Sequence, residues 1–376
     1  MQDFIPVNKP DISGNLEKKY INECIDTGWI SSEGPFVSQF ESEFCKTVDR
    51  KFGIAVSNGS CALDIAITAL NIGPGDEVIL PTFTIISCAT AIIRAGGTPV
   101  LVDCNRDTWN MEASKIEDLI NKNTKAIMVV HIYGLPVEMD TIMELSNKYN
   151  IPIIEDAAEM HGQSYDNKKC GSFGSISTFS FYPNKHITTG EGGMIVTDDE
   201  QIYERCKSLR NLAFNDKQRF VHYEMGWNAR MTNLQAALGL AQLSRFDDFI
   251  IRKRHIGSLY HSILKDEELI DLPIPSLGYA ENIYWVFGIV MKDKNGPKAI
   301  AIMKELAKNK IGTRPFFWPM HQQPVFKKMG LFLDEKHLNS EHIANFGLYL
   351  PSGLGNSDEE IIYSASTLKE ILKKYE

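Results

Sequence analysis

A single lysine, Lys185, stands in a segment whose residue types suit covalent chemistry with a carbonyl compound. Residues 178–182 alternate aromatic and small polar side chains, which is typical of a strand, and Pro183 ends that strand because proline has no N–H to donate. The glycine-rich residues 190–193 permit a tight turn or a close approach of the backbone. An amine held on such a loop can form a Schiff base once burial or a neighbouring cation lowers its pKa. The alternative is an exposed lysine in an ordinary turn.

A strand, a turn of small residues and an apolar helix follow one another early in the chain, at 53–57, 58–60 and 61–70. The free N–H groups of a helix N-terminus point at such a turn, and the helix dipole favours an anion there. Gly59 lets the anion come close, and Ser60 offers a hydroxyl group. The unit therefore suits a phosphate group, although Ser60 could instead only cap the helix.

Asp156 follows the apolar strand predicted at 151–154, where a buried carboxylate would need a cationic partner. One such partner is the protonated nitrogen of a pyridine ring, which then acts as an electron sink. The alternative is that Asp156 caps the segment after it. Asp156, Lys185 and the turn at 57–60 could together hold a ring nitrogen, an aldehyde and a phosphate, so the cofactor we predict is pyridoxal 5′-phosphate.

Strand and helix patterns alternate through the first half of the chain. Patterns typical of strands lie at 53–57, 77–80, 99–103, 126–131, 151–154, 178–182 and 194–197. Patterns typical of helices lie at 11–25, 36–44, 61–70, 87–94, 112–120, 140–148 and 200–209. Apolar strands joined by helical crossovers predict an α/β fold with a buried, mostly parallel sheet. Ligands of such sheets bind at the carboxyl ends of the strands, where 57–60, 131–134 and 155–156 lie.

The 376 residues exceed one ordinary hydrophobic core, so two domains are expected. A helix capped by Thr232 is predicted at 233–243 and a charged helix at 246–264, and prolines at 273 and 275 mark a junction. A strand at 283–291 and helices at 297–308 and 358–375 follow. We expect a large domain over 1–250 and a smaller α+β domain over 251–376.

The overall composition narrows the class of protein. A net charge of −9 argues against a nucleic-acid-binding surface, and no apolar run approaches the roughly 20 residues of a membrane span. The first residues lack the basic and apolar regions of a signal peptide, which predicts a cytoplasmic protein. The seven cysteines are scattered without C-x-x-C pairs, so we expect neither a disulfide framework nor a metal site.

Motifs along nearly the whole chain resemble one known family, the sugar-nucleotide aminotransferases related to DegT, DnrJ, EryC1 and StrS. The segments that carry the resemblance, in the order of the family, are 29–32 (WISS), 56–60 (VSNGS), 75–79 (GDEVI), 125–128 (KAIM), 154–159 (IEDAAE), 185–194 (KHITTGEGGM) and 230–233 (RMTN). The resemblance implies the type I fold of pyridoxal-phosphate enzymes, that of aspartate aminotransferase. Within the family, residues 314–321 (RPFFWPMH) and the Trp29 loop resemble the GDP-perosamine synthases.

The resemblance also implies roles for single residues. Lys185 would be the catalytic lysine that links to the cofactor and later moves the proton, and Asp156 would pair with the pyridine nitrogen. The cofactor phosphate would be bound by Gly59, Ser60 and Ser180. Asn228 would reach that phosphate from the neighbouring subunit, which implies a homodimer with shared active sites. The substrate side would be formed by Trp29, Glu159, His161, Arg230, Arg314 and His321. His321 could instead be a surface histidine with satisfied hydrogen bonds.

Two positions depart from the pattern of the relatives. Ile85 stands where they have an aromatic residue that stacks on the cofactor ring, and an isoleucine would cover that face without a π contact. Tyr182 and Pro183 replace the Phe-Gly of perosamine synthases and resemble other branches, including dehydratases. In dehydratases a histidine replaces the lysine, whereas this chain keeps Lys185.

The predicted function is the transfer of an amino group from L-glutamate to a nucleotide-linked 4-keto-6-deoxy sugar, with ping-pong kinetics. The favoured substrate is GDP-4-keto-6-deoxy-D-mannose, which would give GDP-perosamine for lipopolysaccharide O-antigens, and the alternative is dTDP- or UDP-4-keto-6-deoxyglucose. A dehydratase is a further alternative. A nicotinamide oxidoreductase would use Asp103 at a strand end, but no G-x-G-x-x-G motif precedes it. A non-catalytic regulator would need a basic stripe, which the sequence lacks.

Overall fold

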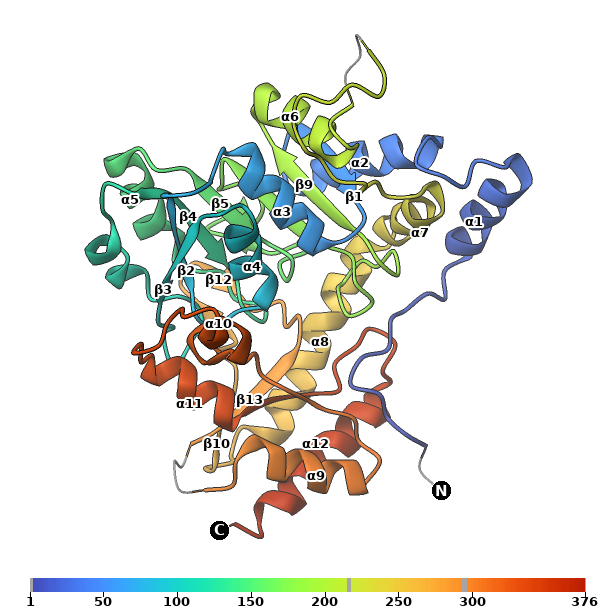
Figure 1. Ribbon diagram of the computed structural model, residues 1–376. Coiled ribbons are helices and arrows are strands. Elements are labelled where there is room, and N and C mark those ends of the chain that lie inside the picture. The colour runs from blue at the N-terminus through green and yellow to red at the C-terminus, as the bar shows by residue number, and fades with distance from the viewer. Residues whose placement is uncertain (1–2, 215–217, 293–295, 376) are drawn as a thin grey trace.

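The computed structural model describes residues 3–214, 218–292 and 296–375, and a seven-stranded sheet forms the centre of the larger part (Figure 1). The strand order is β1-β9-β8-β5-β4-β2-β3. The strands are β1 (Phe52–Val56), β2 (Glu77–Pro81), β3 (Thr98–Val102), β4 (Thr124–Val130), β5 (Ile153–Asp156), β8 (Ile176–Ser180) and β9 (Gly193–Thr197). β9 runs antiparallel to both of its neighbours, and the other neighbouring pairs are parallel. The predicted mostly parallel α/β sheet is therefore confirmed.

Helices cover both faces of this sheet, which is why its strands are apolar on both sides. Along β4, Met128 packs into the core under one helical layer, and Ile127 and Val129 pack into the core under the other. The first layer is formed by α3 (Gly59–Ala69), α4 (Ile86–Arg94) and α6 (Glu200–Arg210). The second is formed by α2 (Pro35–Thr47), α5 (Met139–Tyr149) and α7 (Asn233–Leu243).

The ends of several elements follow from single residues. Helix α1 (Asn15–Thr27) ends at Gly28, which takes the left-handed conformation at φ 74°. Thr232 and Gln235 form a capping box at the start of α7. Strand β8 ends at Ser180, two residues before the predicted end at 182, and the loop that carries Lys185 therefore begins earlier than expected.

The prediction of an α-helix at 112–120 is wrong. This segment forms two 3-10 helices, η1 (Ala113–Lys115) and η2 (Glu117–Leu119). Ala113 and Ile116 are the buried residues that anchor it, and their spacing of three matches the period of a 3-10 helix. So short a segment would also be a marginal α-helix in isolation.

A second, antiparallel sheet of four strands lies below the first in Figure 1, in the order β10-β13-β15-β14. Its strands are β10 (Ile270–Asp271), β13 (Phe287–Met291), β14 (Arg314–Pro315) and β15 (Gly347–Leu350). The helices around it are α8 (Phe246–Leu264), α9 (Ala299–Lys308), α10 (Pro324–Lys328), α11 (Leu338–Phe346) and α12 (Asp358–Leu372). The short pairs β6 (Ser164–Tyr165) with β7 (Lys168–Lys169) and β11 (Ser276–Leu277) with β12 (Ala280–Glu281) complete the strands of the described residues.

The second sheet differs from the sequence prediction at its main strand, which was expected from residue 283. Strand β13 begins only at Phe287, because Tyr284 has a φ of 49° and a strand cannot continue through a left-handed residue. Ile5 forms a bridge with Ile311, so the start of the chain lies against this second part. The division into 1–250 and 251–376 stays a prediction.

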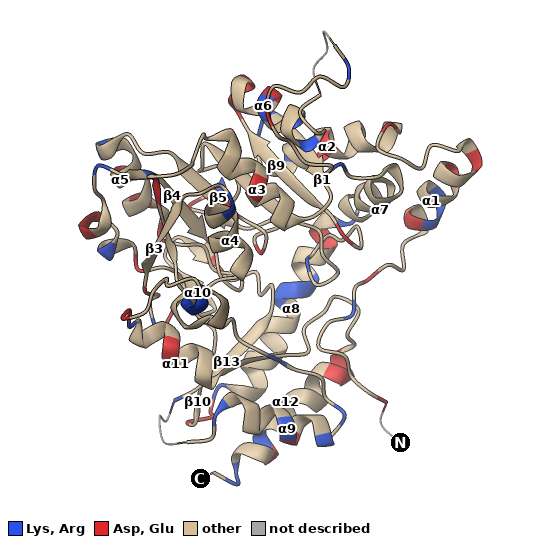
Figure 2. Ribbon diagram, in the orientation of Figure 1, with Lys and Arg blue, Asp and Glu red and all other residues tan. Residues whose placement is uncertain are grey.

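The outer surface carries charges of both signs. Figure 2 shows Lys and Arg interspersed with Asp and Glu on helices such as α1 and α6. In the part of the chain that the structure describes, no helix has both the length and the apolar character to cross a lipid bilayer.

Candidate active site

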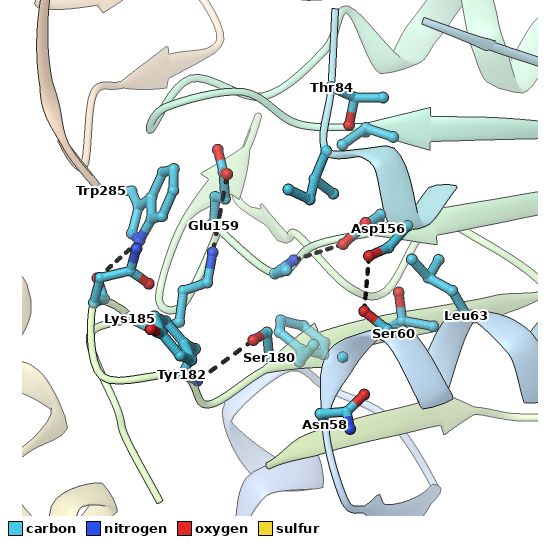
Figure 3. Close-up of a pocket in the computed structure, with 18 of the residues that line it drawn as sticks. Asn58, Ser60, Leu63, Thr84, Asp156, Glu159, Ser180, Tyr182, Lys185 and Trp285 are labelled. Atoms are coloured by element: carbon cyan, nitrogen blue, oxygen red, sulfur yellow. Dashed lines mark hydrogen bonds and ion pairs between the residues drawn. The ribbon is translucent and has the colours of Figure 1, made fainter. Parts of the chain in front are cut away.

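A cavity of ≈ 420 Å³ lies at the carboxyl ends of β4, β5 and β8 (Figure 3). The N-termini of α3 and α4 form one side of it, and Trp285, Phe317 and Tyr349 from the second part of the chain form the opposite wall. It brings together seven of the residues predicted for the site: Gly59, Ser60, Ile85, Asp156, Glu159, Ser180 and Lys185. The sheet edge expected to bind the ligand is therefore where this cavity lies.

Lys185 extends its amine into the cavity from the loop after β8, where its backbone N–H donates to the carbonyl of Tyr182 over 2.9 Å. The side chain is only 10% exposed. Its Nζ lies 3.9 Å from Oε1 of Glu159 and 3.8 Å from the centroid of the Trp285 ring. Burial lowers the pKa of Lys185, and the charges of Glu159 and Asp156 oppose that shift. A lowered pKa is what a nucleophilic amine requires.

Glu159 faces this amine from the segment after β5. Its Oε2 accepts a 2.8 Å hydrogen bond from the backbone N–H of Tyr133. Burial raises the pKa of Glu159 to about 8, while Lys185 and the Tyr133 N–H act to lower it. Burial thus shifts both Glu159 and Lys185 toward their neutral forms, and the 3.9 Å contact allows the two groups to compete for one proton.

Asp156 is buried at the end of β5, with 4% of its surface exposed. Oδ1 accepts from the Ala158 N–H over 3.1 Å, and Oδ2 accepts from the Cys88 thiol over 3.4 Å. Burial raises the pKa of Asp156, although both hydrogen bonds and the charge of Lys185 lower it. Among the described residues no cation lies within 4.0 Å of this carboxylate. A ligand that carries a protonated nitrogen would supply the missing partner.

The N-terminus of α3 forms the anion-binding end of the cavity. Asn58 caps the helix, and its Oδ1 accepts from the Cys61 N–H over 2.8 Å. A Cβ on Gly59 would lie 2.9 Å from the Cβ of Ser180, so only glycine fits this turn against β8. The hydroxyls of Ser60 and Ser87 are 2.7 Å apart. A helix N-terminus with hydroxyl groups and no side chain at Gly59 suits a phosphate.

The middle of the cavity is mostly apolar, and Ile85, Val130 and Ala158 line it. The Thr178 hydroxyl is buried at this wall and has no hydrogen-bond partner among the residues that the structure describes. Such a group is usually satisfied by a ligand or an ordered water. An unpaired carboxylate, an apolar centre and a helix N-terminus therefore fit the nitrogen, the ring and the phosphate of pyridoxal phosphate.

Two predicted histidines lie outside the cavity lining. His161 is buried among Phe44, Phe179 and Phe181, and its Nδ1 accepts from the Ile187 N–H. Burial lowers its pKa to about 3, so the ring is neutral. His321 is also buried, and hydrogen bonds join it to Thr82 and Glu341 over 2.8 and 3.2 Å. The sequence left open that His321 is a surface histidine with satisfied hydrogen bonds. Its hydrogen bonds are satisfied, but the residue is buried.

The other four predicted residues lie at or near the surface. The guanidinium of Arg230 binds Oδ1 of Asn228 over 2.7 and 3.2 Å and Oδ1 of Asn211 over 2.8 Å. Trp29 is 52% exposed in the loop after α1. Arg314 is exposed on β14, where its ladder partner Tyr349 lines the cavity. A substrate role for each of these residues stays a prediction.

Several cavity residues are absent from the set predicted from the sequence, foremost Trp285, Phe317 and Tyr349. These aromatic residues lie 100 or more positions from Lys185 in the chain, and no local motif marks them. Thr178 is predicted only as part of a strand, and its alternation with Phe179 puts the two side chains on opposite faces of that strand. That alternation was the available signal.

Comparison with known proteins agrees with this geometry. The model of the DegT/DnrJ/EryC1/StrS aminotransferase family matches residues 11–369. The chain is 41% identical to GDP-perosamine synthase of Escherichia coli O157:H7 and 39% identical to that of Caulobacter vibrioides, in each case over 98% of both chains. Among solved structures, S. venezuelae DesV is 28% identical, with a TM-score of 0.91 over 100% of both chains. The chain belongs to the DegT/DnrJ/EryC1/StrS aminotransferase family and is a pyridoxal-phosphate-dependent enzyme of the type I fold.

Proposed function

We propose that the protein is a cytoplasmic homodimer that transfers an amino group from L-glutamate to GDP-4-keto-6-deoxy-D-mannose and so forms GDP-perosamine. The observation that carries the proposal is one cavity that holds Lys185, the buried carboxylate of Asp156 and the N-terminus of α3. Two GDP-perosamine synthases that align with almost the whole chain support the choice of sugar nucleotide. Such a product would be used in the synthesis of lipopolysaccharide O-antigens.

Pyridoxal phosphate, when bound, stores the amino group between two half-reactions and delocalises the electron pair that remains on a carbon after its proton is removed. The residues of this chain supply the rest. Asp156 would keep the ring nitrogen protonated, and the first turn of α3 would fix the phosphate. The Nζ of Lys185 would take the proton from the substrate carbon and return it, because it is the amine that reaches the cavity.

The wall that faces Lys185 suits a sugar. Trp285, Phe317 and Tyr349 present aromatic surface to the cavity, and an aromatic face packs well against a hexose ring. Arg314 stands beside Tyr349 on the antiparallel ladder. Its guanidinium could bind a diphosphate with two parallel hydrogen bonds. We assign Arg314 to the nucleotide on this ground, with Trp29 and Arg230 as further candidates.

The substrate assignment predicts a ranking of three sugar nucleotides. With glutamate as donor, GDP-4-keto-6-deoxy-D-mannose should have a higher kcat/KM than dTDP- or UDP-4-keto-6-deoxyglucose, measured in competition at equal concentrations. The favoured substrate carries a purine base and a mannose-configured ring, whereas the alternatives carry a pyrimidine base and a glucose-configured ring. The substrate pocket can therefore distinguish the compounds by the base and by the sugar. A preference for the dTDP or UDP compound would reject the GDP assignment and leave the aminotransferase assignment in place.

A homodimer is proposed because Asn228 lies outside the cavity of its own chain. It is exposed and hydrogen-bonded to Arg230. The same surface loop carries strongly exposed apolar side chains, with Tyr223 81% and Met225 91% exposed. Apolar side chains exposed to this degree favour an interface with a second copy of the chain. Asn228 of one subunit would then serve the cofactor of the other.

Subunit mixing tests this shared site. Lys185→Ala and Asn228→Ala should each be inactive alone, and a mixture should regain activity because one site of each heterodimer has both residues intact. After full exchange of equal amounts, about a quarter of the wild-type activity is expected for random pairing. Lys185→Ala mixed with Asp156→Asn is the matched control, because both residues belong to the cavity of one chain and no intact site can form. Equal failure of both mixtures under proven exchange would place Asn228 in its own subunit's site.

A further inference from the structure

Trp285 covers the amine of Lys185 and is held at two points. The centroid of its ring lies 3.8 Å from Nζ of Lys185. Both side chains are labelled in Figure 3. Its indole N–H donates to the carbonyl of Asn184 over 2.8 Å. Its own backbone carbonyl accepts a 2.7 Å hydrogen bond from Nζ of Lys253. The ring is thus fixed between the loop of the reactive lysine and helix α8.

Lys253 is a buried lysine that the reaction does not use directly. It is 2% exposed on α8, and its Nζ also donates to the carbonyl of Ser352 over 2.5 Å. Within the described residues it forms no ion pair with a carboxylate, and burial lowers its pKa to about 7. An uncharged amine still carries two N–H groups, which equals the number of carbonyls it meets. Both hydrogen bonds therefore persist whether or not Lys253 is charged.

The segment that carries Trp285 needs such a tether. It precedes β13 and is not part of the ladder, since Tyr284 interrupts the strand with its φ of 49°. Backbone carbonyls outside a ladder must find other donors when they are buried. Lys253 supplies the donor for Trp285 and joins the same amine to the segment after β15. Without it, the carbonyl of Trp285 would lose its hydrogen bond and the segment could relax.

We propose that Lys253 is a positioning residue that sets the indole of Trp285 over the Lys185 amine. The indole face attracts a protonated amine, as does the Glu159 side chain 3.9 Å away when it is ionised. Together they hold the proton of Lys185 in the cavity against the effect of burial. This inference rests on the proposed function, in which Lys185 is the reacting amine.

Few ionisable groups lie around Lys185, so the effect of a change at Trp285 on the pKa of Lys185 can be detected. Glu159 and Asp156 are the acidic groups that raise its pKa. Burial lowers the pKa of His161 and His186, so both imidazoles are neutral, and it raises that of Tyr133, which therefore stays a neutral phenol. Removing the indole from the amine should then move the pKa of Lys185 further down.

Lys253→Met tests the proposal, because methionine keeps the length and apolar character of the side chain and removes both donors. In the full chain freed of cofactor, Lys185 should react with a small acylating reagent at lower pH, by about one pH unit, as measured by peptide mass spectrometry. In the holoenzyme kcat should fall about tenfold or more with a smaller change in KM. The labelling experiment needs no substrate, so it separates failure of this inference from failure of the proposed function.

Tyr260→Phe is the matched control. Tyr260 lies on the same helix, is fully buried, and its hydroxyl donates to the carbonyl of Pro351 over 2.7 Å, next to the Ser352 carbonyl that Lys253 binds. The variant loses a buried hydrogen bond to the same segment without touching Trp285. Its Tm should fall, whereas the labelling of Lys185 and both kinetic constants should match the wild type. If Lys253→Met resembles Tyr260→Phe in labelling and kinetics, the positioning role is rejected.

A double-mutant cycle with Trp285→Leu gives a second, independent decision. Once the indole is absent, replacing Lys253 should change neither the labelling pH of Lys185 nor kcat any further. Additive effects of the two replacements would overturn the proposal, because Lys253 would then act on Lys185 by another route. If Lys253→Met does not fold, Lys253→Leu replaces it in the same cycle, since leucine also lacks N–H donors and is smaller.

Discussion

Lys185→Ala should abolish amine transfer and leave the fold intact. In the proposed function this residue supplies both the covalent link to the cofactor and the group that moves the proton. Turnover should therefore fall by about 10⁴-fold or more, the upper range for acid–base groups. Borohydride reduction should attach the cofactor to the wild-type peptide that contains Lys185 and leave the variant unlabelled. Peptide mapping by mass spectrometry and a kinetic assay measure the two effects.

The stability of this variant distinguishes a catalytic lysine from a structural one. Burial lowers the pKa of Lys185 although Glu159 and Asp156 oppose the shift, so the folded chain binds this proton less tightly than the unfolded chain. At pH values below the unfolded-state pKa the lysine therefore opposes folding, and Tm should be unchanged or raised in Lys185→Ala.

Lys207→Ala is the matched lysine control, because Lys207 is half exposed on α6 and does not line the cavity. Its amine lies 3.6 Å from Glu204 and 5.3 Å from the centroid of the Tyr203 ring, both on the same helix. Such a surface pair contributes little, so this variant should behave as the wild type. Label found on Lys207, or on Lys168 or Lys169, would reject the assignment of the active site. So would a loss of activity in Lys207→Ala equal to that in Lys185→Ala.

Much of the fold could be predicted because its strands are local and apolar on both faces. The capped helix α7 and the long α8 have the predicted bounds 233–243 and 246–264. The failures occurred where tertiary structure overrides a pattern. Residues 112–120 have helical spacing, but the buried Ala113 and Ile116 hold them as 3-10 turns. Residues 283–286 are as apolar as a strand, but Tyr284 takes a left-handed conformation that no composition reveals.

The candidate site divides in a similar way. Lys185, Asp156 and the turn at Gly59 could be found because each follows a strand, and the carboxyl ends of parallel strands meet at one edge of a sheet. The direction of a side chain beyond such a position was not predictable. His161 follows the same strand as Asp156, yet its ring turns into a cluster of phenylalanines. Trp285 comes from the segment just before β13 of the second sheet, and only the packing of the two parts brings it to Lys185.

Glu155 and Asp156 are neighbouring carboxylates at the end of β5 whose pKa values shift in opposite directions. Burial acts to raise the pKa of Glu155, but hydrogen bonds from His131, Gly171 and Gly174 hold it at about 2. Its ionised form therefore stabilises the folded chain above the unfolded-state pKa, and this stabilisation is lost as the pH falls through the folded-state pKa. Asp156 has the opposite shift, because burial raises its pKa and its two hydrogen bonds only partly compensate. Above that raised pKa, ionised Asp156 costs stability.

Asp156→Asn should therefore lose activity without losing the fold. Asparagine cannot hold the ring nitrogen protonated, so kcat should fall by about 10²–10³-fold, the range for the loss of one electrostatic stabiliser. The cofactor should still bind at the N-terminus of α3, and the Tm of the cofactor-free chain at neutral pH should be unchanged or raised. Glu155→Gln should do the reverse, with a lower Tm and near-normal kcat in the folded fraction. Calorimetry and turnover assays on both variants check the pair. The two residues are adjacent on one strand, so the variants form a matched pair. Near-wild-type turnover of Asp156→Asn would reject the role of Asp156 at the ring nitrogen. Equal losses of Tm in both variants would instead make Asp156 a structural residue.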